Sequence, residues 1–197
     1  MLLDHLTKMA RNNAWSNHRL YAACAKLPEA EYRATRVSFF PTIPLTLSHI
    51  LTVDWYYIDA LERALTRREP NREPVRFFEP EEPFETCAAL SVAQHEADRR
   101  LVVACTALTD DRLDLPVPVM RRAGLQNESA TRLLAHLFQH QIHHRGQAHA
   151  MLAGTPVKPP QLDEFFCANE AHLRAAELAE LGYSEALIWN GADRPRA

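Results

Sequence analysis

The segment HLFQHQIHHRGQAH, residues 136–149, contains five of the ten histidines in this 197-residue chain. It lies within a longer stretch, about 127–151, whose core positions recur at alternating steps of three and four. That spacing is typical of a helix packed nearly parallel to its neighbours, and we call such a line of positions a seam. The seam runs Ala130, Leu133, Leu137, His140, His144, Gln147 and Met151. Two consecutive core positions are therefore histidines, which indicates a helix built to bind a metal.

His140 and His144 are four residues apart, so their imidazoles stand one turn apart on the same helix face. This spacing lets two nitrogens reach one ion at about 2.0–2.1 Å, as in the HExxH helix of zinc enzymes. Gln141 stands where that motif has its glutamate, so the general base of the motif is absent. Without a metal, two neutral imidazoles in an apolar core would leave nitrogens unpaired, at a cost of about 1–3 kcal/mol each.

Two neighbouring histidines keep the choice of ligands open. His136 and His143 lie seven residues apart beside the seam, and His136 with His140 is a second pair at a spacing of four. We prefer His140 and His144 because both lie on the buried line. His136 is then expected to support the site or to contact another helix. A polar core network of histidines without any metal is the alternative.

A zinc site needs a further protein ligand from another helix, and His49 is the best candidate. It is the only histidine on the apolar face of the helix predicted after Pro44. A hydrogen-bonded core histidine without a ligand role is the competing interpretation of His49. The other histidines lie off the predicted seams or near the ends of helices: His5, His18, His95 and His172.

The prolines predict the helices. All 13 lie outside five windows: 1–27, 45–69, 84–115, 119–155 and 161–194. Because proline breaks a helix interior and the chain has only 5 glycines, these windows predict about five helices. The charged segment 69–83 is long enough, at roughly 3.3 Å per residue, to run the length of a bundle. We therefore expect an all-α fold, a four-helix bundle with a long crossover between helices two and three, plus an additional C-terminal helix at about 161–182.

The chain is expected to form a single domain, 1–197, whose core covers about residues 2–155. The segment LPVPVM, 115–120, is expected to be extended, and Gly124 to turn the chain into the fourth helix. Asn127 and Ser129 are the two candidates for the N-cap of that helix, because their side-chain oxygens can accept from its first amides.

Composition excludes several classes of function. The net charge of −3, with signs mixed along the chain, gives no indication of a nucleic-acid partner. No apolar run approaches the roughly 20 residues of a membrane span, and the first residues lack the features of a signal peptide, so we expect a cytoplasmic protein without a membrane partner. The four cysteines form no CxxC pair, which argues against a cysteine zinc site. They are Cys24, Cys87, Cys105 and Cys167.

Three short motifs give the chain a resemblance to a known family. His49 lies in LSHILTVDWYY, residues 140–147 read HQIHHRGQ, and residues 12–20 read NNAWSNHRL. A histidine early in the second helix followed by HxxxHRGQ in the fourth resembles the DinB superfamily of DinB/YfiT-like metalloenzymes, over about residues 2–170. The resemblance implies a four-helix bundle with a long crossover and a divalent ion, zinc or nickel, bound by His49, His140 and His144. It also implies a homodimer, and some relatives are transferases or isomerases that use low-molecular-weight thiols.

Three histidine ligands leave one coordination position open, as in catalytic zinc sites. A water or a thiol at that position predicts a metal-dependent hydrolase or a thiol S-transferase acting on a small molecule, with catalytic residues unknown. The alternative is a non-catalytic structural or stress-response module in which the ion joins two helices. Asp54 is about 140° around its helix from His49 and is expected to point away from the metal.

The residues Arg145, Gly146 and Gln147 of the HRGQ motif also have expected roles. Arg145 points off the seam and is expected to pair with an acid on a neighbouring helix. Gly146 lacks a side chain, which would allow another helix to approach closely. Gln147 lies on the seam one turn after His144 and could orient a ligand or a bound water.

Overall fold

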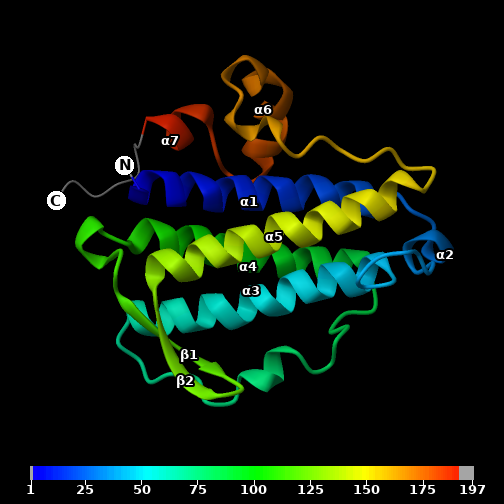
Figure 1. Ribbon diagram of the computed structural model, residues 1–197. Coiled ribbons are helices and arrows are strands. Elements are labelled where there is room, and N and C mark those ends of the chain that lie inside the picture. Colours follow the sequence, from blue (N-terminus) through cyan, green and yellow to red (C-terminus); the bar gives the residue numbers. More distant parts are fainter. Residues whose placement is uncertain (1, 191–197) are drawn as a thin grey trace.

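Four long helices lie side by side in the computed structural model, which describes residues 2–190 (Figure 1). They are α1 (Leu2–Cys24), α3 (Ile43–Leu65), α4 (Cys87–Ala107) and α5 (Ala130–Ala153), and the short α2 (Glu29–Tyr32) lies between α1 and α3. α1 and α5 run in one direction, and α3 and α4 run in the other (Figure 1). The expected all-α bundle is confirmed.

The crossover joins α3 to α4, two parallel helices, and therefore has to return along the whole bundle (Figure 1). Residues 66–86 make this connection and include the 3-10 helix η1 (Pro74–Phe77). Phe77, Phe78 and Phe84 of the crossover are partly buried against the bundle core. The segment is thus held to the bundle by apolar contacts despite its charged, proline-rich composition.

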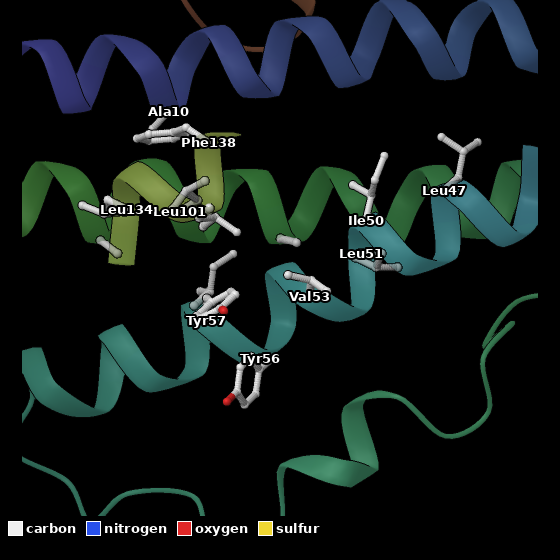
Figure 2. Close-up of a cluster of buried hydrophobic side chains, with 14 of the residues drawn as sticks. Ala10, Leu47, Ile50, Leu51, Val53, Tyr56, Tyr57, Leu101, Leu134 and Phe138 are labelled. Carbon is white, nitrogen blue, oxygen red and sulfur yellow. The ribbon is translucent and has the colours of Figure 1, made fainter. Parts of the chain in front are cut away.

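All four long helices contribute to one hydrophobic core. Figure 2 shows Ala10 of α1 beside Phe138 of α5, and Leu101 of α4 near Tyr57 of α3. The core residues recur at steps of three and four along each helix, so one face of each helix is removed from water. Full burial of a leucine or phenylalanine contributes about 1.5–3 kcal/mol. The core thereby fixes how α3 faces α5, and these two helices carry the predicted metal ligands.

A β-hairpin precedes α5, and this differs from the expectation that Gly124 leads directly into the helix. β1 (Pro116–Arg121) pairs antiparallel with β2 (Gly124–Ser129). Gly124 has a φ of 103°, a conformation that favours glycine, and it closes the turn. Val117 and Val119 are buried, and the Tyr56 hydroxyl donates to the carbonyl of Met120 at 2.6 Å. Residues 124–129 form a strand because β1 supplies their hydrogen-bonding partners.

The start of α5 depends on Ser129, whose Oγ accepts a hydrogen bond from the amide of Arg132 at 3.3 Å. Ser129 is therefore the cap, and Asn127 lies within β2. Ser129→Ala is expected to lower the free energy of unfolding by about 1 kcal/mol, because a helix amide loses its acceptor. Urea unfolding measures the change. Ser91→Ala, inside α4, is the matched control and should cost nothing, and an equal loss in both variants would contradict the capping role.

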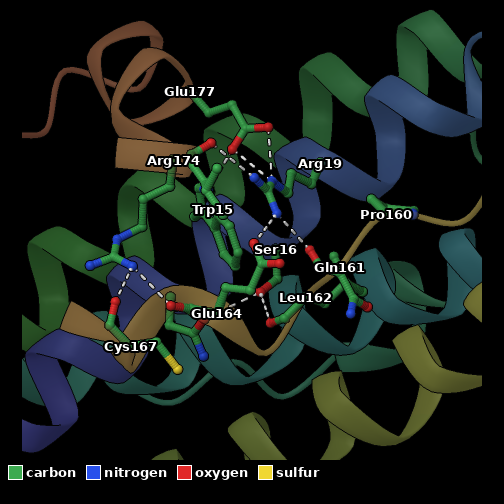
Figure 3. Close-up of polar contacts among 12 residues, drawn as sticks. Trp15, Ser16, Arg19, Pro160, Gln161, Leu162, Glu164, Cys167, Arg174 and Glu177 are labelled. Carbon is green, nitrogen blue, oxygen red and sulfur yellow. Dashed lines mark hydrogen bonds and ion pairs between the residues drawn. The ribbon is translucent and has the colours of Figure 1, made fainter. Parts of the chain in front are cut away.

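The C-terminal part is more broken than the single helix expected at about 161–182. It consists of η3 (Glu164–Phe166), η4 (Ala168–Glu170), α6 (Ala171–Glu180) and α7 (Glu185–Trp189). Arg174 is only 1% exposed and donates to the carbonyl oxygens of Glu164 and Cys167 at 2.8 and 2.9 Å (Figure 3). Because the arginine satisfies these carbonyls, the chain can turn before α6 without continuing a helix.

This C-terminal part covers the flank of α1 (Figure 1). The Trp15 indole nitrogen donates to Glu177 at 2.8 Å, and Arg19 forms ion pairs with Glu164 and Glu177 (Figure 3). A second small core lies beneath these contacts and consists of Trp15, Phe165, Leu178 and Ile188. The NNAWSN segment of α1 thus anchors the C-terminal part on the face opposite α3.

No helix among residues 2–190 is long and apolar enough to cross a bilayer. The four cysteines are free thiols: Cys24 and Cys105 are buried, Cys87 is half-buried and Cys167 is exposed.

Candidate metal centre

His49 of α3 meets His140 and His144 of α5 between the two helices. One potential ligand atom from each imidazole lies within 4.8 Å of the other two. The Nε2 atoms of His49 and His140 are 3.0 Å apart, and the ring of His144 is 4.6 Å from that of His49 and 4.4 Å from that of His140. The structure therefore brings together the three histidines selected from the sequence. Their role as metal ligands stays a prediction.

The environment keeps these imidazoles neutral. Burial, followed by repulsion from His144, lowers the pKa of His49 to about 4. Burial and the neighbouring histidines lower the pKa of His140 to about 3, and burial also lowers the pKa of His144. All three rings are thus unprotonated near neutral pH, the state in which imidazole binds metal ions.

The unpaired nitrogens of the cluster fit a divalent ion. The Nδ1 of His140 is buried and has no hydrogen-bond partner among residues 2–190. The Nε2 atoms of His49 and His140 face each other, although two neutral imidazoles share at most one hydrogen there. An ion bound between the two facing Nε2 atoms would use both of their lone pairs, and the Nδ1 of His140 would then carry the ring hydrogen. Imidazole suits zinc, nickel and copper.

Gln147 orients one of the three histidines. The Nδ1 of His144 donates to Oε1 of Gln147 at 2.8 Å, which leaves the Nε2 of His144 free for an ion. The side-chain amide of Gln147 also contacts Nε2 of His143 at 3.1 Å. Gln147 therefore orients a candidate metal ligand, one of the two roles expected from the sequence.

Gln147→Leu is expected to weaken zinc affinity about 10- to 100-fold, because His144 loses the bond that fixes its tautomer and orientation. Competition with a chromophoric chelator measures the affinity. Gln139→Leu on the exposed face of α5 is the control and should bind zinc like the unsubstituted protein. Unchanged affinity in Gln147→Leu would show that His144 needs no such support.

The remaining histidines of α5 lie outside the cluster. The ring of His136 packs against Tyr57 of α3 at 5.3 Å and is 6.3 Å from that of His140. His143 is exposed, and His149 contacts the carbonyl of Pro160 at 2.9 Å. In the described part of the chain, one set of three or more histidine, cysteine or acidic residues is close enough together to hold an ion. It consists of His49, His140 and His144.

Two residues of this site carried no recognisable signal in the sequence. Phe40, from the loop before α3, lies over the cluster with its ring 4.5 Å from that of His49 and 5.7 Å from that of His144. Beside it a pocket of about 100 Å³ opens next to His49. Glu81 of the crossover lines this pocket and supplies the only carboxylate among the described residues around it. Both residues lie in loops, where helix periodicity gives no information.

A network of buried polar side chains joins the four long helices beside the cluster. Asp54 of α3 accepts from Gln94 at 2.7 Å and from Gln141, and Asp98 of α4 accepts from Asn17 at 2.9 Å. Arg145 donates to Asn17 at 3.1 Å, to Gln141 at 3.0 Å and to Asn13. This network ties α5 to α1, α3 and α4 immediately beside the two histidines of α5.

Arg145 differs from its predicted role. It is 5% exposed, and its hydrogen bonds go to amide oxygens rather than directly to an acid. The two carboxylates attract it from a greater distance: burial lowers its pKa to about 10, while Asp98 and Asp54 oppose this effect. Asp54 does not belong to the histidine cluster, because its carboxylate is bound within the network.

The buried carboxyl group of Asp98 makes stability depend on pH. Burial, then repulsion from Asp54, raises its pKa to about 8, against about 3.9 in an unfolded chain. Between these values unfolding releases a proton, so stability falls as the pH rises. The metal-free protein is expected to lose up to about 1 kcal/mol between pH 7 and 8, and Asp98→Asn should flatten this dependence. Urea unfolding across that range measures both, and identical slopes would contradict the assignment.

Gly146 was expected to allow the close approach of another helix, but no described helix approaches it in this way. A Cβ at this position would have no heavy atom within 4 Å. The glycine lines a cavity of about 570 Å³ between α1, α5 and residues 161–166.

The fold and the cluster together define a helical-bundle protein with a candidate three-histidine metal centre. Residues 2–177 match the family model of the DinB family, and the chain belongs to that family. Protein DinB of Bacillus subtilis (strain 168) is 26% identical over 155 residues, which cover 76% of this chain and 85% of that protein. The resemblance inferred from the sequence motifs is confirmed. Family membership and the histidine cluster both fit a metal-binding protein.

Proposed function

We propose that this protein is a metal-dependent enzyme that acts on a small molecule, either by hydrolysis or by transfer of a low-molecular-weight thiol. The observation that carries the proposal is the cluster of three histidines beside a pocket of about 100 Å³. Three protein ligands leave one position open on a tetrahedral ion, as in catalytic zinc sites. Zinc and nickel both suit a site of three imidazoles.

When bound, the ion would act as a Lewis acid and would lower the pKa of a water or thiol at the open position. The protein supplies the surroundings. Phe40 and Phe78 form apolar walls of the pocket and limit the access of bulk water. Glu81 is the one carboxylate that lines it, and it is our candidate for accepting a proton from the reacting group.

Activity can be tested with one preparation in two metal states. The protein is stripped with a chelator, reloaded with zinc or nickel, and assayed with nitrophenyl esters, anilides and the conjugation of a small thiol to an electrophile. Turnover is expected only after reloading, and Glu81→Gln should lower kcat without lowering metal content. If the reloaded protein turns over none of these substrates, enzymatic function loses its support.

A structural role for the ion is the second candidate, and the coverage of the cluster by Phe40 favours it. In that case the ion joins α3 to α5, and the small pocket serves no substrate. This role predicts a large fall in Tm on chelation, no turnover in either metal state, and no effect of Glu81→Gln on any measured property.

A further inference from the structure

Another cavity, larger than the two described above, lies on the crossover side of the bundle, between η1, the β-hairpin and α3. Its volume is about 690 Å³, and four of its ten lining residues are arginines: Arg72, Arg76, Arg121 and Arg122. The cavity shares no residue with the histidine cluster. Its walls come from segments far apart in the sequence, which only the fold brings together.

The arginines of this cavity carry an excess of positive charge. Among residues 2–190, Glu73 is the only acid that lines it, and Glu73 pairs with Arg76 at 2.6 Å. Arg72 and Arg122 make no hydrogen bond or ion pair with any residue from 2 to 190. Three arginines therefore line the cavity without a carboxylate partner among the described residues of its lining. Outside the lining, Glu128 of β2 is close enough to interact electrostatically with Arg121.

Arg121 is held in place before any ligand binds. Its Nη1 donates to the Tyr57 hydroxyl at 2.8 Å, and its guanidinium carbon is 5.7 Å from the centre of the Tyr56 ring and 5.3 Å from that of Tyr57. Stacking and hydrogen bonding reduce the freedom that this side chain would lose on binding an anion. A fixed guanidinium with spare donors matches a carboxylate or a phosphate.

The arginine cavity is adjacent to the pocket beside His49. Phe78 lines both of them, and its ring is 5.5 Å from that of Tyr56. On α3, Tyr56 follows His49 by two turns on the same face, a rise of about 10 Å along the axis. An elongated small molecule could thus have one end among the arginines and the other near the histidines.

We propose that the arginine cavity binds the carboxylate or phosphate group of a small molecule. That this molecule is the substrate of the histidine site rests on the proposed function. Binding of the anionic group needs only Arg72, Arg121 and Arg122, and it can therefore be measured without a metal.

The test uses the full chain after removal of metal, because carboxylates and phosphates also bind metal ions. Titration calorimetry at low salt measures the affinity for phenyl phosphate and for succinate, with benzyl alcohol and dimethyl succinate as uncharged analogues. Saturable one-to-one binding of at least one anion is expected, with no binding of its uncharged analogue. The stronger of the two anions identifies the preferred group.

Arg72→Gln/Arg122→Gln is expected to weaken that binding at least tenfold. Arg67→Gln/Arg132→Gln removes the same charge from exposed positions outside the cavity and should leave the affinity unchanged. Equal weakening in both variants, or no binding of either anion to the unsubstituted protein, would overturn the inference. If the metal-loaded protein shows turnover but the protein binds neither anion, this inference is wrong and the proposed function stands. If an anion binds but no turnover is seen, the proposed function is wrong and this inference stands.

Discussion

His140→Ala is expected to abolish stoichiometric binding of zinc or nickel, with an affinity loss of at least about 100-fold. The imidazole of His140 contacts both of the others: its Nε2 is 3.0 Å from that of His49, and its ring is 4.4 Å from that of His144. Its removal leaves two ligands on different helices, too few for a structural or a catalytic zinc site. Elemental analysis after gel filtration measures the bound metal, and calorimetry measures the affinity.

His136→Ala and His143→Ala are the matched controls, because they remove the same side chain from the same helix. The ring of His136 packs on Tyr57, and His143 is exposed and contacts Gln147. Both variants should retain one equivalent of metal. If His140→Ala binds as much zinc or nickel as the unsubstituted protein, or if either control loses its metal, the ligand assignment is wrong.

Arg145→Leu is expected to lower the free energy of unfolding by about 3–5 kcal/mol. The substitution removes a buried cation that the carboxylates of Asp54 and Asp98 attract, and it leaves the side-chain oxygens of Asn13 and Asn17 without this donor. Uncompensated charge and unpaired acceptors in the core are both costly. Urea unfolding of the metal-free protein gives the difference.

Arg132→Leu tests whether the loss is specific to the network. Arg132 lies on the same helix, is exposed, and should change stability by less than about 0.5 kcal/mol. Arg145→Lys is expected to recover little, because a lysine ammonium cannot reproduce the planar, multiple donors of arginine. A loss below about 1 kcal/mol in Arg145→Leu would show that water or rearranged amides replace the guanidinium.

The bundle could be predicted because helix periodicity is local. The steps of three and four around His140 and His144 placed them on the buried face of α5, and His49 was the one histidine on the apolar face of α3. The prolines around segment 69–83 marked the crossover, since its length has to match that of the bundle. The cluster of three histidines could therefore be predicted from their seam positions and the family motifs alone.

Contacts between segments far apart in the sequence could not be predicted in this way. Phe40 and Glu81 reach the site from loops, and their positions depend on how the chain folds around the bundle. Arg145 was expected to pair with an acid on a neighbouring helix, but it donates to amide oxygens of α1 and α5, and the carboxylates of α3 and α4 attract it from a greater distance. The break in the expected C-terminal helix could not be predicted for the same reason. It depends on the buried Arg174, which donates hydrogen bonds to the backbone carbonyls of Glu164 and Cys167.

X-ray absorption spectroscopy of the zinc-loaded protein tests the central claim most directly. Three imidazole nitrogens at about 2.0–2.1 Å are predicted, with one oxygen ligand in the open position. The same measurement on the nickel-loaded protein should again show three imidazoles. Sulfur ligands at about 2.3 Å, or fewer than three imidazoles in both samples, would contradict a metal centre formed by His49, His140 and His144.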